Sequence, residues 1–278
     1  MSSIVSMQWV KEHMNYPDVI LVDCRFSLGQ LGEGRAAYEA NHLPGAVYFD
    51  LELDLSSPVA EHGGRHPLPD VNILAAKLGA AGIGSTKRII AYDDQGGAMA
   101  CRFWLLLRYY GHRHTVVMDK GYTAWEQEGN EVTNHVHEVQ ADQFIPHIQD
   151  DWIVSRGEVM AKLGTKGTVL IDSRDPNRFA GREETIDAVA GHIPGALNRF
   201  WKDGMDANGH WKPSQEQRQR FADLSEDKEI IVYCGSGVTA CPNVLALKDA
   251  GYPNVKLYAG SWSDWITYER APIAMGEV

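Results

Sequence analysis

Residues 229–240 read Glu-Ile-Ile-Val-Tyr-Cys-Gly-Ser-Gly-Val-Thr-Ala. The apolar run has the length of a buried strand and ends directly at Cys234. Small residues follow the cysteine, and a helical pattern begins near residue 240. In such a loop successive backbone N–H groups can turn inward, and the start of a helix adds partial positive charge. Because both features favour an anion, we expect the thiol of Cys234 to be shifted toward the nucleophilic thiolate.

The pattern around this stretch occurs twice in the 278 residues. Val-Ile-Leu-Val-Asp-Cys-Arg at 19–25 corresponds to Val-Leu-Ile-Asp-Ser-Arg at 169–174. Asn-His-Leu-Pro-Gly-Ala-Val at 41–47 corresponds to Gly-His-Ile-Pro-Gly-Ala-Leu at 191–197. Corresponding residues of the two copies are 140 to 150 residues apart. This spacing is far longer than the roughly 20–50 residues of a solenoid repeat. It indicates a duplicated domain.

We therefore expect a first domain over residues 1–128, a polar linker over 129–152 and a second domain over 153–278. Each half alternates short apolar runs with helical patterns, which predicts an α/β fold of two tandem domains, each a mainly parallel sheet flanked by helices. The expected strands lie near 19–23, 46–49, 88–92, 115–118, 168–172, 195–198, 229–233 and 255–258. The expected helices lie near 71–81, 98–110, 121–128, 155–163, 215–224, 240–250 and 261–269.

The two halves differ at the residue that follows the equivalent strand. Ligands of open parallel sheets bind beyond the carboxyl ends of the strands, and Cys234 lies at such an end. The equivalent residue of the first half is Asp93, in Tyr-Asp-Asp-Gln-Gly-Gly. An aspartate cannot act as a sulfur nucleophile. We therefore expect the second domain to be catalytic and the first to be non-catalytic.

Almost the whole chain resembles the two-domain rhodanese-like sulfurtransferases of the thiosulfate/3-mercaptopyruvate kind. The resemblance rests on Asp-x-Arg and His-x-Pro-Gly-Ala, each present twice, and on Cys-Gly-Ser-Gly-Val-Thr-Ala at 234–240. The neutral Gly235 and Ser236 resemble the mercaptopyruvate version of the loop. The resemblance implies transfer of a sulfane sulfur from 3-mercaptopyruvate to a thiophilic acceptor through a cysteine persulfide. Thiosulfate:cyanide sulfurtransfer is the alternative, and a non-enzymatic rhodanese-like binding module is a further one.

The loop supplies most of the expected site. Cys234 is the expected nucleophile, and the backbone N–H groups of Gly235, Gly237, Val238 and Thr239 are expected to hold the sulfur anion. Glycine at 235 and 237 permits close backbone approach and unusual dihedral angles. Thr239 is suited to capping the following helix. The Ser236 hydroxyl is expected to relay the proton that the pyruvate enolate needs.

The resemblance also implies residues outside the loop. Arg178, in Asn-Arg-Phe, lies where the family has its substrate-binding arginine, and a guanidinium matches a carboxylate in shape. Arg182 is a second candidate, although the family places its second arginine further along. His66 corresponds to a histidine that completes a Ser–His–acid arrangement, with Glu52 as the matching acid. Asp50 is the alternative acid.

Composition limits the partners. The net charge of −11 argues against a nucleic-acid binder, and no apolar run approaches the roughly 20 residues that cross a bilayer. The four cysteines form no Cys-x-x-Cys pair, and no histidine cluster has zinc spacing, so we expect free thiols, no metal and no cofactor. A reducing, cytoplasmic location is expected. The expected partners are a small sulfur donor and a thiol or cyanide acceptor, with thioredoxin as a candidate.

A phosphatase reading is disfavoured, although dual-specificity phosphatases share the fold and a loop cysteine. Their signature needs an arginine six residues after the cysteine to bind phosphate. The residue at that position is Ala240.

Overall fold

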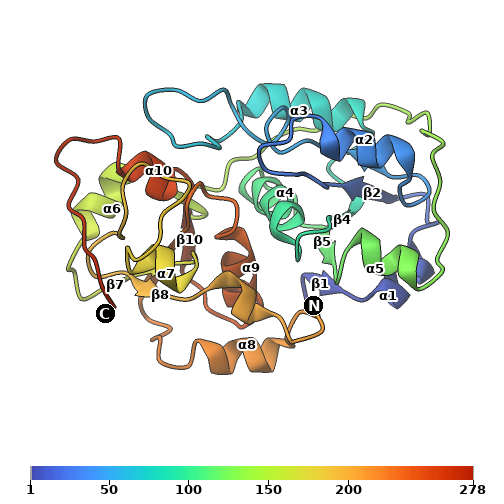
Figure 1. The fold of residues 1–278 in the computed structure, drawn as a ribbon. Coiled ribbons are helices and arrows are strands. Elements are labelled where there is room, and N and C mark those ends of the chain that lie inside the picture. The colour runs from blue at the N-terminus through green and yellow to red at the C-terminus, as the bar shows by residue number, and fades with distance from the viewer. Residues whose placement is uncertain (1, 278) are drawn as a thin grey trace. The chain divides into compact units, whose positions relative to one another are not determined.

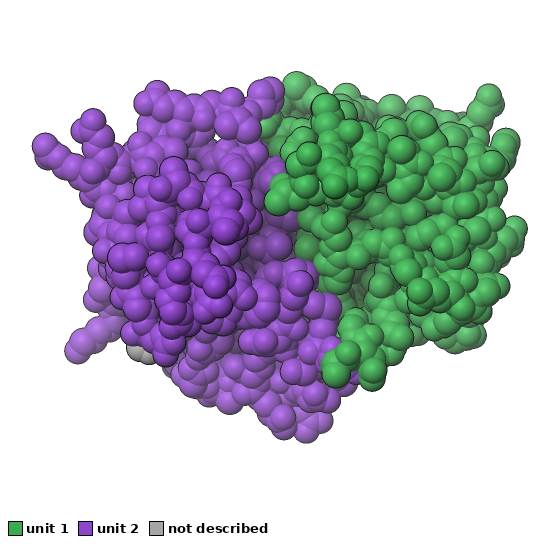
Figure 2. All heavy atoms as spheres, viewed as in Figure 1, with its two compact units in different colours: residues 1–57, 69–149, 207–211 green, residues 58–68, 150–206, 212–278 purple. Residues whose placement is uncertain are grey.

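The computed structural model describes residues 2–277, and Figure 1 shows its helices and strands. The chain divides into two compact units, coloured separately in Figure 2. Unit 1 contains residues 1–57, 69–149 and 207–211. Unit 2 contains residues 58–68, 150–206 and 212–278. The segment 58–68 thus belongs by its contacts to the unit formed mainly by the second half of the chain.

Unit 1 is built on a parallel sheet of five strands in the order β1-β5-β4-β2-β3. Its central strands consist largely of Val, Ile and Leu, as expected for strands that are covered on both faces. The strands are β1 (Ile4–Val5), β2 (Val19–Asp23), β3 (Val47–Tyr48), β4 (Arg88–Tyr92) and β5 (Thr115–Met118). The helices are α1 (Met7–His13), α2 (Glu33–Ala40), α3 (Val71–Ala80), α4 (Ala98–Tyr109) and α5 (Tyr122–Gln127).

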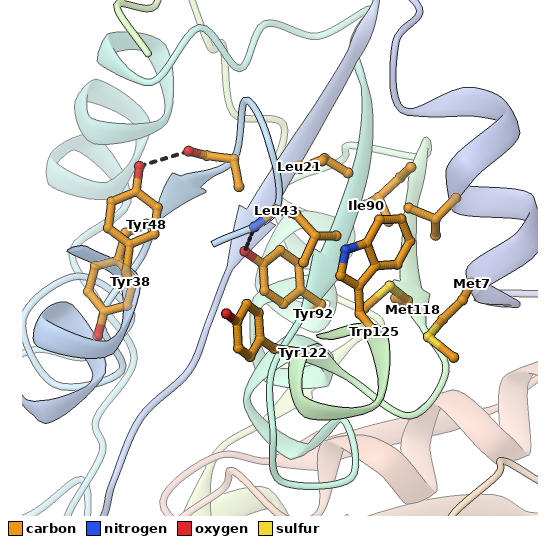
Figure 3. Close-up of a cluster of buried hydrophobic side chains, with 12 residues drawn as sticks. Met7, Leu21, Tyr38, Leu43, Tyr48, Ile90, Tyr92, Met118, Tyr122 and Trp125 are labelled. Atoms are coloured by element: carbon orange, nitrogen blue, oxygen red, sulfur yellow. Dashed lines mark hydrogen bonds between the residues drawn. The ribbon is translucent and has the colours of Figure 1, made fainter. Parts of the chain in front are cut away.

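A buried cluster joins one face of this sheet to its helices. Leu21 of β2 and Ile90 of β4 are neighbours in register, and Trp125 of α5 packs in the same cluster. Figure 3 shows the Tyr92 ring beneath Leu43, with the tyrosine hydroxyl accepting the Leu43 N–H at 3.2 Å. The end of β4 is therefore fixed both by apolar contact and by a hydrogen bond.

Unit 2 repeats this architecture. Its five parallel strands have the order β6-β10-β9-β7-β8, the same topology as in unit 1. The strands are β6 (Ile153–Val154), β7 (Thr168–Asp172), β8 (Leu197–Asn198), β9 (Glu229–Tyr233) and β10 (Val255–Tyr258). The helices are α6 (Arg156–Lys162), α7 (Pro176–Phe179), the 3-10 helix η1 (Trp201–Gly204), α8 (Ser214–Arg220), α9 (Cys241–Asp249) and α10 (Ser261–Trp265). The prediction of two parallel-sheet domains flanked by helices is confirmed.

The repeated Asp-x-Arg pieces have the same structural role in both units. Arg174 donates to the carboxylate of Asp172 at 2.7 Å and to the carbonyl of Gly191 at 2.6 Å. Arg25 makes the same pair of bonds, to Asp23 at 2.7 Å and to the carbonyl of Asn41 at 2.6 Å. These buried ion pairs therefore tie β7 and β2 to the residue just before the His-x-Pro-Gly turn in each unit.

Short elements depart from the sequence expectation. Six of the expected strands match the structure residue for residue, namely β2, β4, β5, β7, β9 and β10. The strands β1 and β6 and the helices α1, α2 and α7 were not predicted from the sequence. Along residues 2–277, none of the helices combines the length and the apolar character needed to span a bilayer.

Candidate active site

Cys234 lies at the carboxyl end of the central strand β9, where the loop to α9 begins. Its side chain is buried, with the residue 1% exposed. The N–H of Gly237 donates to the Cys234 sulfur at 3.2 Å. Gly237 has a φ of +76°, and a Cβ at this position would overlap the carbonyl oxygen of Ala259. Only glycine can therefore place this N–H on the sulfur.

The start of the helix after the loop differs from the sequence expectation. Helix α9 begins at Cys241, and Ala240 at its N-cap position provides no side-chain cap. Thr239 is half-buried and does not cap the helix, so that expectation was wrong. Val238 is buried, and its carbonyl accepts the N–H of Cys241 at 3.0 Å.

The first turn of α10 holds the backbone on both sides of the cysteine. Ser261 accepts the Cys234 N–H through its hydroxyl at 3.1 Å, and the N–H of Trp262 donates to the Cys234 carbonyl at 3.0 Å. The N–H of Ser263 donates to the Gly235 carbonyl at 2.9 Å. Ser261 itself has a φ of +57°, an unusual conformation for a residue with a side chain. The position of the sulfur is thus set by the neighbouring turn as well as by β9.

Ser236 and His66 are brought together. The Nδ1 atom of His66 lies 2.8 Å from the Ser236 hydroxyl oxygen, and both residues are buried. Which atom donates depends on the histidine tautomer. A buried hydroxyl–imidazole pair beside a thiol can pass a proton to and from a bound molecule.

His66 reaches this place because the segment 58–68 is anchored on α10. The N–H of Gly63 donates to Asp264 at 2.7 Å, and the N–H of Arg65 donates to the Ser263 hydroxyl at 3.1 Å. Asp264 also accepts the hydroxyl hydrogen of Tyr258 at 2.5 Å. A Cβ on Gly64 would overlap the carbonyl oxygen of Gly260, so the two segments touch backbone to backbone.

Glu52 belongs to unit 1, whereas His66 belongs to unit 2. Glu52 is exposed, and its N–H donates to the Asp50 carboxylate at 2.8 Å. Asp50 is buried and also accepts the Tyr48 hydroxyl at 3.0 Å, which gives it a structural role in its own turn. The pairing of Glu52 with His66 stays a prediction.

Arg178 lies close to the loop, at the end of the short helix α7. Its guanidinium forms ion pairs with Glu184 at 2.9 Å and with Asp187 at 2.7 Å, and its side chain remains 19% exposed. A Cβ placed on Gly235 would lie 3.7 Å from both terminal nitrogens of Arg178. Arg178 is therefore near enough to Cys234 to contact a molecule bound there.

Arg182 is placed away from these contacts. Its side chain is 51% exposed and pairs with Glu277 at 2.7 Å and with Asn177 at 3.0 Å. Its role in binding substrate stays a prediction, and these contacts give it no support.

Sequence reasoning missed Arg65. Its guanidinium pairs with Asp187, and a Cβ on Gly235 would lie 2.9 Å from its Nη2 atom. Burial lowers the pKa of Arg65, the nearby Cys234 acts in the opposite direction, and the Arg178 charge lowers it further. Adjacency to His66 in Gly-Gly-Arg-His was the one signal that pointed to this residue.

The described residues contain no group of three or more His, Cys, Asp or Glu side chains that is arranged to hold a metal ion. All four cysteines are buried, and none forms a disulfide within residues 2–277.

Comparison with known proteins gives the family of this site. The profile of the rhodanese-like domain matches residues 6–128 and again 155–268. The chain belongs to the rhodanese-like family. Each of the two units described above contains most of one matched copy, and the Cys234 loop lies in the second rhodanese-like domain.

Relatives resemble the chain over nearly its full length. A Pseudomonas aeruginosa protein named a probable 3-mercaptopyruvate sulfurtransferase is 41% identical, over 99% of each chain. A Mycobacterium tuberculosis protein, provisionally named the thiosulfate sulfurtransferase SseB, is 34% identical over 93% of this chain and 91% of its own. The crystal structure of the 3-mercaptopyruvate sulfotransferase SseA from Escherichia coli has a TM-score of 0.81 and 32% identity, covering 95% of this chain and all of its own.

Proposed function

We propose that this protein is a 3-mercaptopyruvate sulfurtransferase that carries the transferred sulfur as a persulfide on Cys234. The observation that carries the proposal is the buried thiol at the end of β9, with a loop N–H directed at its sulfur and the Ser236–His66 pair beside it. The names of the full-length relatives support the choice of donor. The second domain is catalytic in this proposal, and the first is not.

The reaction has two steps that balance. The Cys234 thiolate attacks the donor sulfur, the carbon–sulfur bond breaks, and its electron pair leaves on the carbon of the pyruvate enolate. The proton that the donor thiol loses is the proton that the enolate carbon gains. Ser236 and His66 are placed to move that proton. An acceptor thiolate or cyanide then takes the outer sulfur and restores the Cys234 thiolate.

The remaining assignments follow from this reaction. The loop N–H groups of Gly235, Gly237, Val238 and Thr239 hold the anionic sulfur in both steps. Arg178 binds the donor carboxylate. A small thiol, cyanide or reduced thioredoxin is the acceptor. The buried thiols, none of which forms a disulfide in the part of the chain that the structure describes, fit a reducing, cytoplasmic location.

The first experiment looks for the covalent intermediate. The protein is incubated with 3-mercaptopyruvate, and the peptide that contains Cys234 is examined by mass spectrometry. We expect a gain of about 32 Da, the mass of one sulfur atom, which disappears when a thiol acceptor is added. A wild-type protein without this adduct would contradict the proposal.

Variants and donors then test the assignment. Cys234→Ser should remove sulfur transfer with either donor, whereas Cys24→Ser should retain it. The control is matched, because Ser173 occupies the position equivalent to Cys24 in unit 2, and both residues donate an N–H at 2.8 Å to the last residue of the adjacent strand. We expect kcat/KM to be higher for 3-mercaptopyruvate than for thiosulfate. A preference for thiosulfate of about tenfold or more would assign the chain to thiosulfate:cyanide sulfurtransfer instead.

A further inference from the structure

A cavity lies in unit 1, at the amino ends of its strands. Its volume is about 710 Å³, and it is bounded by β1, the first residues of β4 and β5, α1 and the end of α4. All of its lining residues belong to unit 1, so it shares none with the Cys234 loop. The volume is within the roughly 300–1,000 Å³ of small-molecule binding sites.

The charged side chains of this cavity are all basic. Three arginines line it, Arg88, Arg108 and Arg113, together with the histidines His13 and His114. None of its lining residues, within the part of the chain that the structure describes, is an Asp or Glu. The whole chain has a net charge of −11, so its composition alone would not lead us to expect such a basic cavity. The local potential favours a negatively charged ligand.

The equivalent place in unit 2 contains a carboxylate of the chain itself. Glu229 begins β9 as Arg88 begins β4, and these two strands pair in the same register with β7 and β2. The Glu229 carboxylate forms ion pairs with Lys162 at 2.6 Å and with Lys256 at 3.0 Å. Lys162 is the last residue of α6, as His13 is of α1. Unit 2 thus has an anion between two cations at this place.

Unit 1 has the basic groups of this arrangement without the carboxylate. Arg88 occupies the position of the glutamate of β9, and His13 occupies that of the lysine of α6. Val116 of β5 occupies the position of the second lysine, which makes this side of the cavity apolar. A bound anion would therefore supply in unit 1 the charge that Glu229 supplies in unit 2.

Two of the arginines have guanidinium donors for such an anion. Arg88 is held by Asp18, to which its Nε donates at 2.8 Å and its Nη2 at 3.0 Å. Within residues 2–277, its Nη1 donors take part in no hydrogen bond, and Arg113 is exposed and forms no ion pair. Because a guanidinium presents five N–H donors in a planar fork, both side chains can bind a carboxylate.

The wall beside these cations is apolar and partly aromatic. The rings of Trp9 and His13 are stacked, with their centroids 3.9 Å apart. The Nδ1 atom of His13 lies 2.8 Å from the Trp9 carbonyl oxygen, which fixes the histidine ring. Ile4 and Val116 are half-buried and also line the cavity. A fixed aromatic ring and aliphatic side chains next to guanidinium groups suit a flat apolar body that carries one negative group.

We propose that this cavity binds a small organic anion with a flat apolar body, of the aromatic carboxylate class, and that Arg88 and Arg113 bind its carboxylate. The inference goes beyond the proposed function and does not depend on it, because the cavity and the Cys234 loop have no residue in common.

The test compares two probes of equal shape and different charge, 2-naphthoate and its neutral amide 2-naphthamide. Isothermal titration calorimetry with the full chain measures their dissociation constants. For 2-naphthoate we expect a dissociation constant on the order of 100 µM, typical of a ligand of this size. The amide should bind about tenfold or more weakly, because it loses the charge-assisted hydrogen bonds.

Variants then place the bound probe in the cavity. Arg88→Gln should weaken 2-naphthoate binding about tenfold and leave the amide within about twofold. Arg88→Glu copies unit 2 and should weaken 2-naphthoate binding further, because a carboxylate then faces the ligand. Arg113→Gln should show the same charge-selective loss. It keeps the test decisive if the Arg88 variants unfold, which thermal unfolding will report.

Two control variants remove arginines from other places. Arg35→Gln removes an exposed arginine of unit 1 that does not line the cavity, and should leave the dissociation constant of 2-naphthoate within about twofold. Arg178→Gln removes a cation beside the Cys234 loop and should leave it equally unchanged.

Three outcomes would overturn the inference. Equal binding of acid and amide would mean that the arginines do not recognise charge, and the absence of measurable binding would mean that the cavity does not accept this class of ligand. Weaker binding in Arg178→Gln but not in the Arg88 and Arg113 variants would place the probe at the Cys234 loop. None of these results bears on whether Cys234 forms a persulfide, so the proposed function is tested separately.

Discussion

The loops that follow β4 and β9 occupy equivalent places in the two sheets but begin with different side chains, Asp93 and Cys234. After β4, the Asp93 carboxylate accepts four backbone N–H groups, from Gln95, Gly97, Met99 and Ala100, at 2.7–2.9 Å. After β9, the Cys234 sulfur occupies the corresponding position and accepts the N–H of Gly237 at 3.2 Å. Both loops therefore direct backbone dipoles at the first side chain beyond the strand.

The difference shows what this loop geometry selects for. In unit 1 a carboxyl group fills this position as a buried, fixed part of the chain. Burial raises the pKa of Asp93, and the four backbone hydrogen bonds act in the opposite direction. In unit 2 the same kind of loop faces a thiol. In the proposed reaction the negative charge moves from the Cys234 sulfur to the outer sulfur of the persulfide and back. Under the proposed function, one side chain separates a structural loop from a reactive one, and exchanging side chains between the loops tests that proposal.

The largest effect is expected from Cys234→Asp, which gives unit 2 the side chain of unit 1. A carboxylate in this loop cannot form a persulfide, so we expect kcat with either sulfur donor to fall by about 10⁴-fold or more. Circular dichroism should show that the fold is retained. Sulfur transfer above the level of Cys234→Ser would show that the nucleophile lies elsewhere.

A smaller effect is expected from Ser236→Ala. The equivalent residue in unit 1 is Gln95, which donates its side-chain amide to the Phe26 carbonyl and takes no part in a hydroxyl–histidine pair. Removing the hydroxyl should lower kcat with 3-mercaptopyruvate by about 10²- to 10³-fold, because the enolate carbon must be protonated. With thiosulfate the loss should be smaller, since sulfite leaves without protonation at carbon. Equal losses with the two donors would contradict the proton relay.

Asp93→Asn examines the equivalent loop of unit 1. The variant keeps the shape of the side chain but turns one acceptor oxygen into a donor that faces backbone N–H groups. We expect the free energy of unfolding to fall by about 2–4 kcal/mol, measured by denaturant unfolding. Asp94→Asn is the matched control. Asp94 is exposed and accepts the N–H of Thr123. We therefore expect Asp94→Asn to lower the free energy of unfolding by about 1 kcal/mol or less. Similar losses of stability for Asp93→Asn and Asp94→Asn would show that the four hydrogen bonds to Asp93 add no particular stability.

The smallest effect concerns pH. His112 of unit 1 and Tyr252 of unit 2 follow equivalent glycines, and burial lowers the pKa of His112 to about 4, from its ordinary 6.5. Above pH 6.5 the histidine is neutral in both states. As the pH falls from 6.5 to 4, the unfolded chain binds a proton that the folded chain does not, so stability decreases, by at most about 3 kcal/mol.

The variant His112→Tyr copies the residue of unit 2 and should remove this contribution. Denaturant unfolding at pH 7.5 and pH 4.5 measures it as a difference between the variant and the wild type. If both proteins lose the same stability on acidification, His112 is not the group responsible.

Sequence patterns predicted the long, central elements of the fold well. The strands β2, β4, β7 and β9 are apolar runs that end at polar residues, so their bounds follow from composition. The two-residue strands β1 and β6 were missed, because such strands are defined by pairing with β5 and β10 and have no periodicity of their own. The four-residue α7 was missed for a related reason, since it is too short to show a helical repeat.

The candidate site was predictable where it follows the chain and less so where it depends on folding. The loop around Cys234 is one continuous segment, and its residues lie together as expected. The resemblance to a family placed His66, which the structure brings to Ser236. Arg65 was missed because an arginine in a polar loop looks solvated in the sequence. Only the packing of 58–68 on α10 turns it toward Gly235.

The segment 58–68 makes the second unit depend on residues that the first repeat contains. It is encoded in the first repeat, yet its backbone is bonded to α10 of the second. Expressing the second repeat alone, from residue 150 onward, would keep the Cys234 loop and leave out His66 and Arg65, which lie beside it. A fragment that begins at residue 150 would therefore lack eleven residues of its own compact unit, because these residues are encoded before the linker.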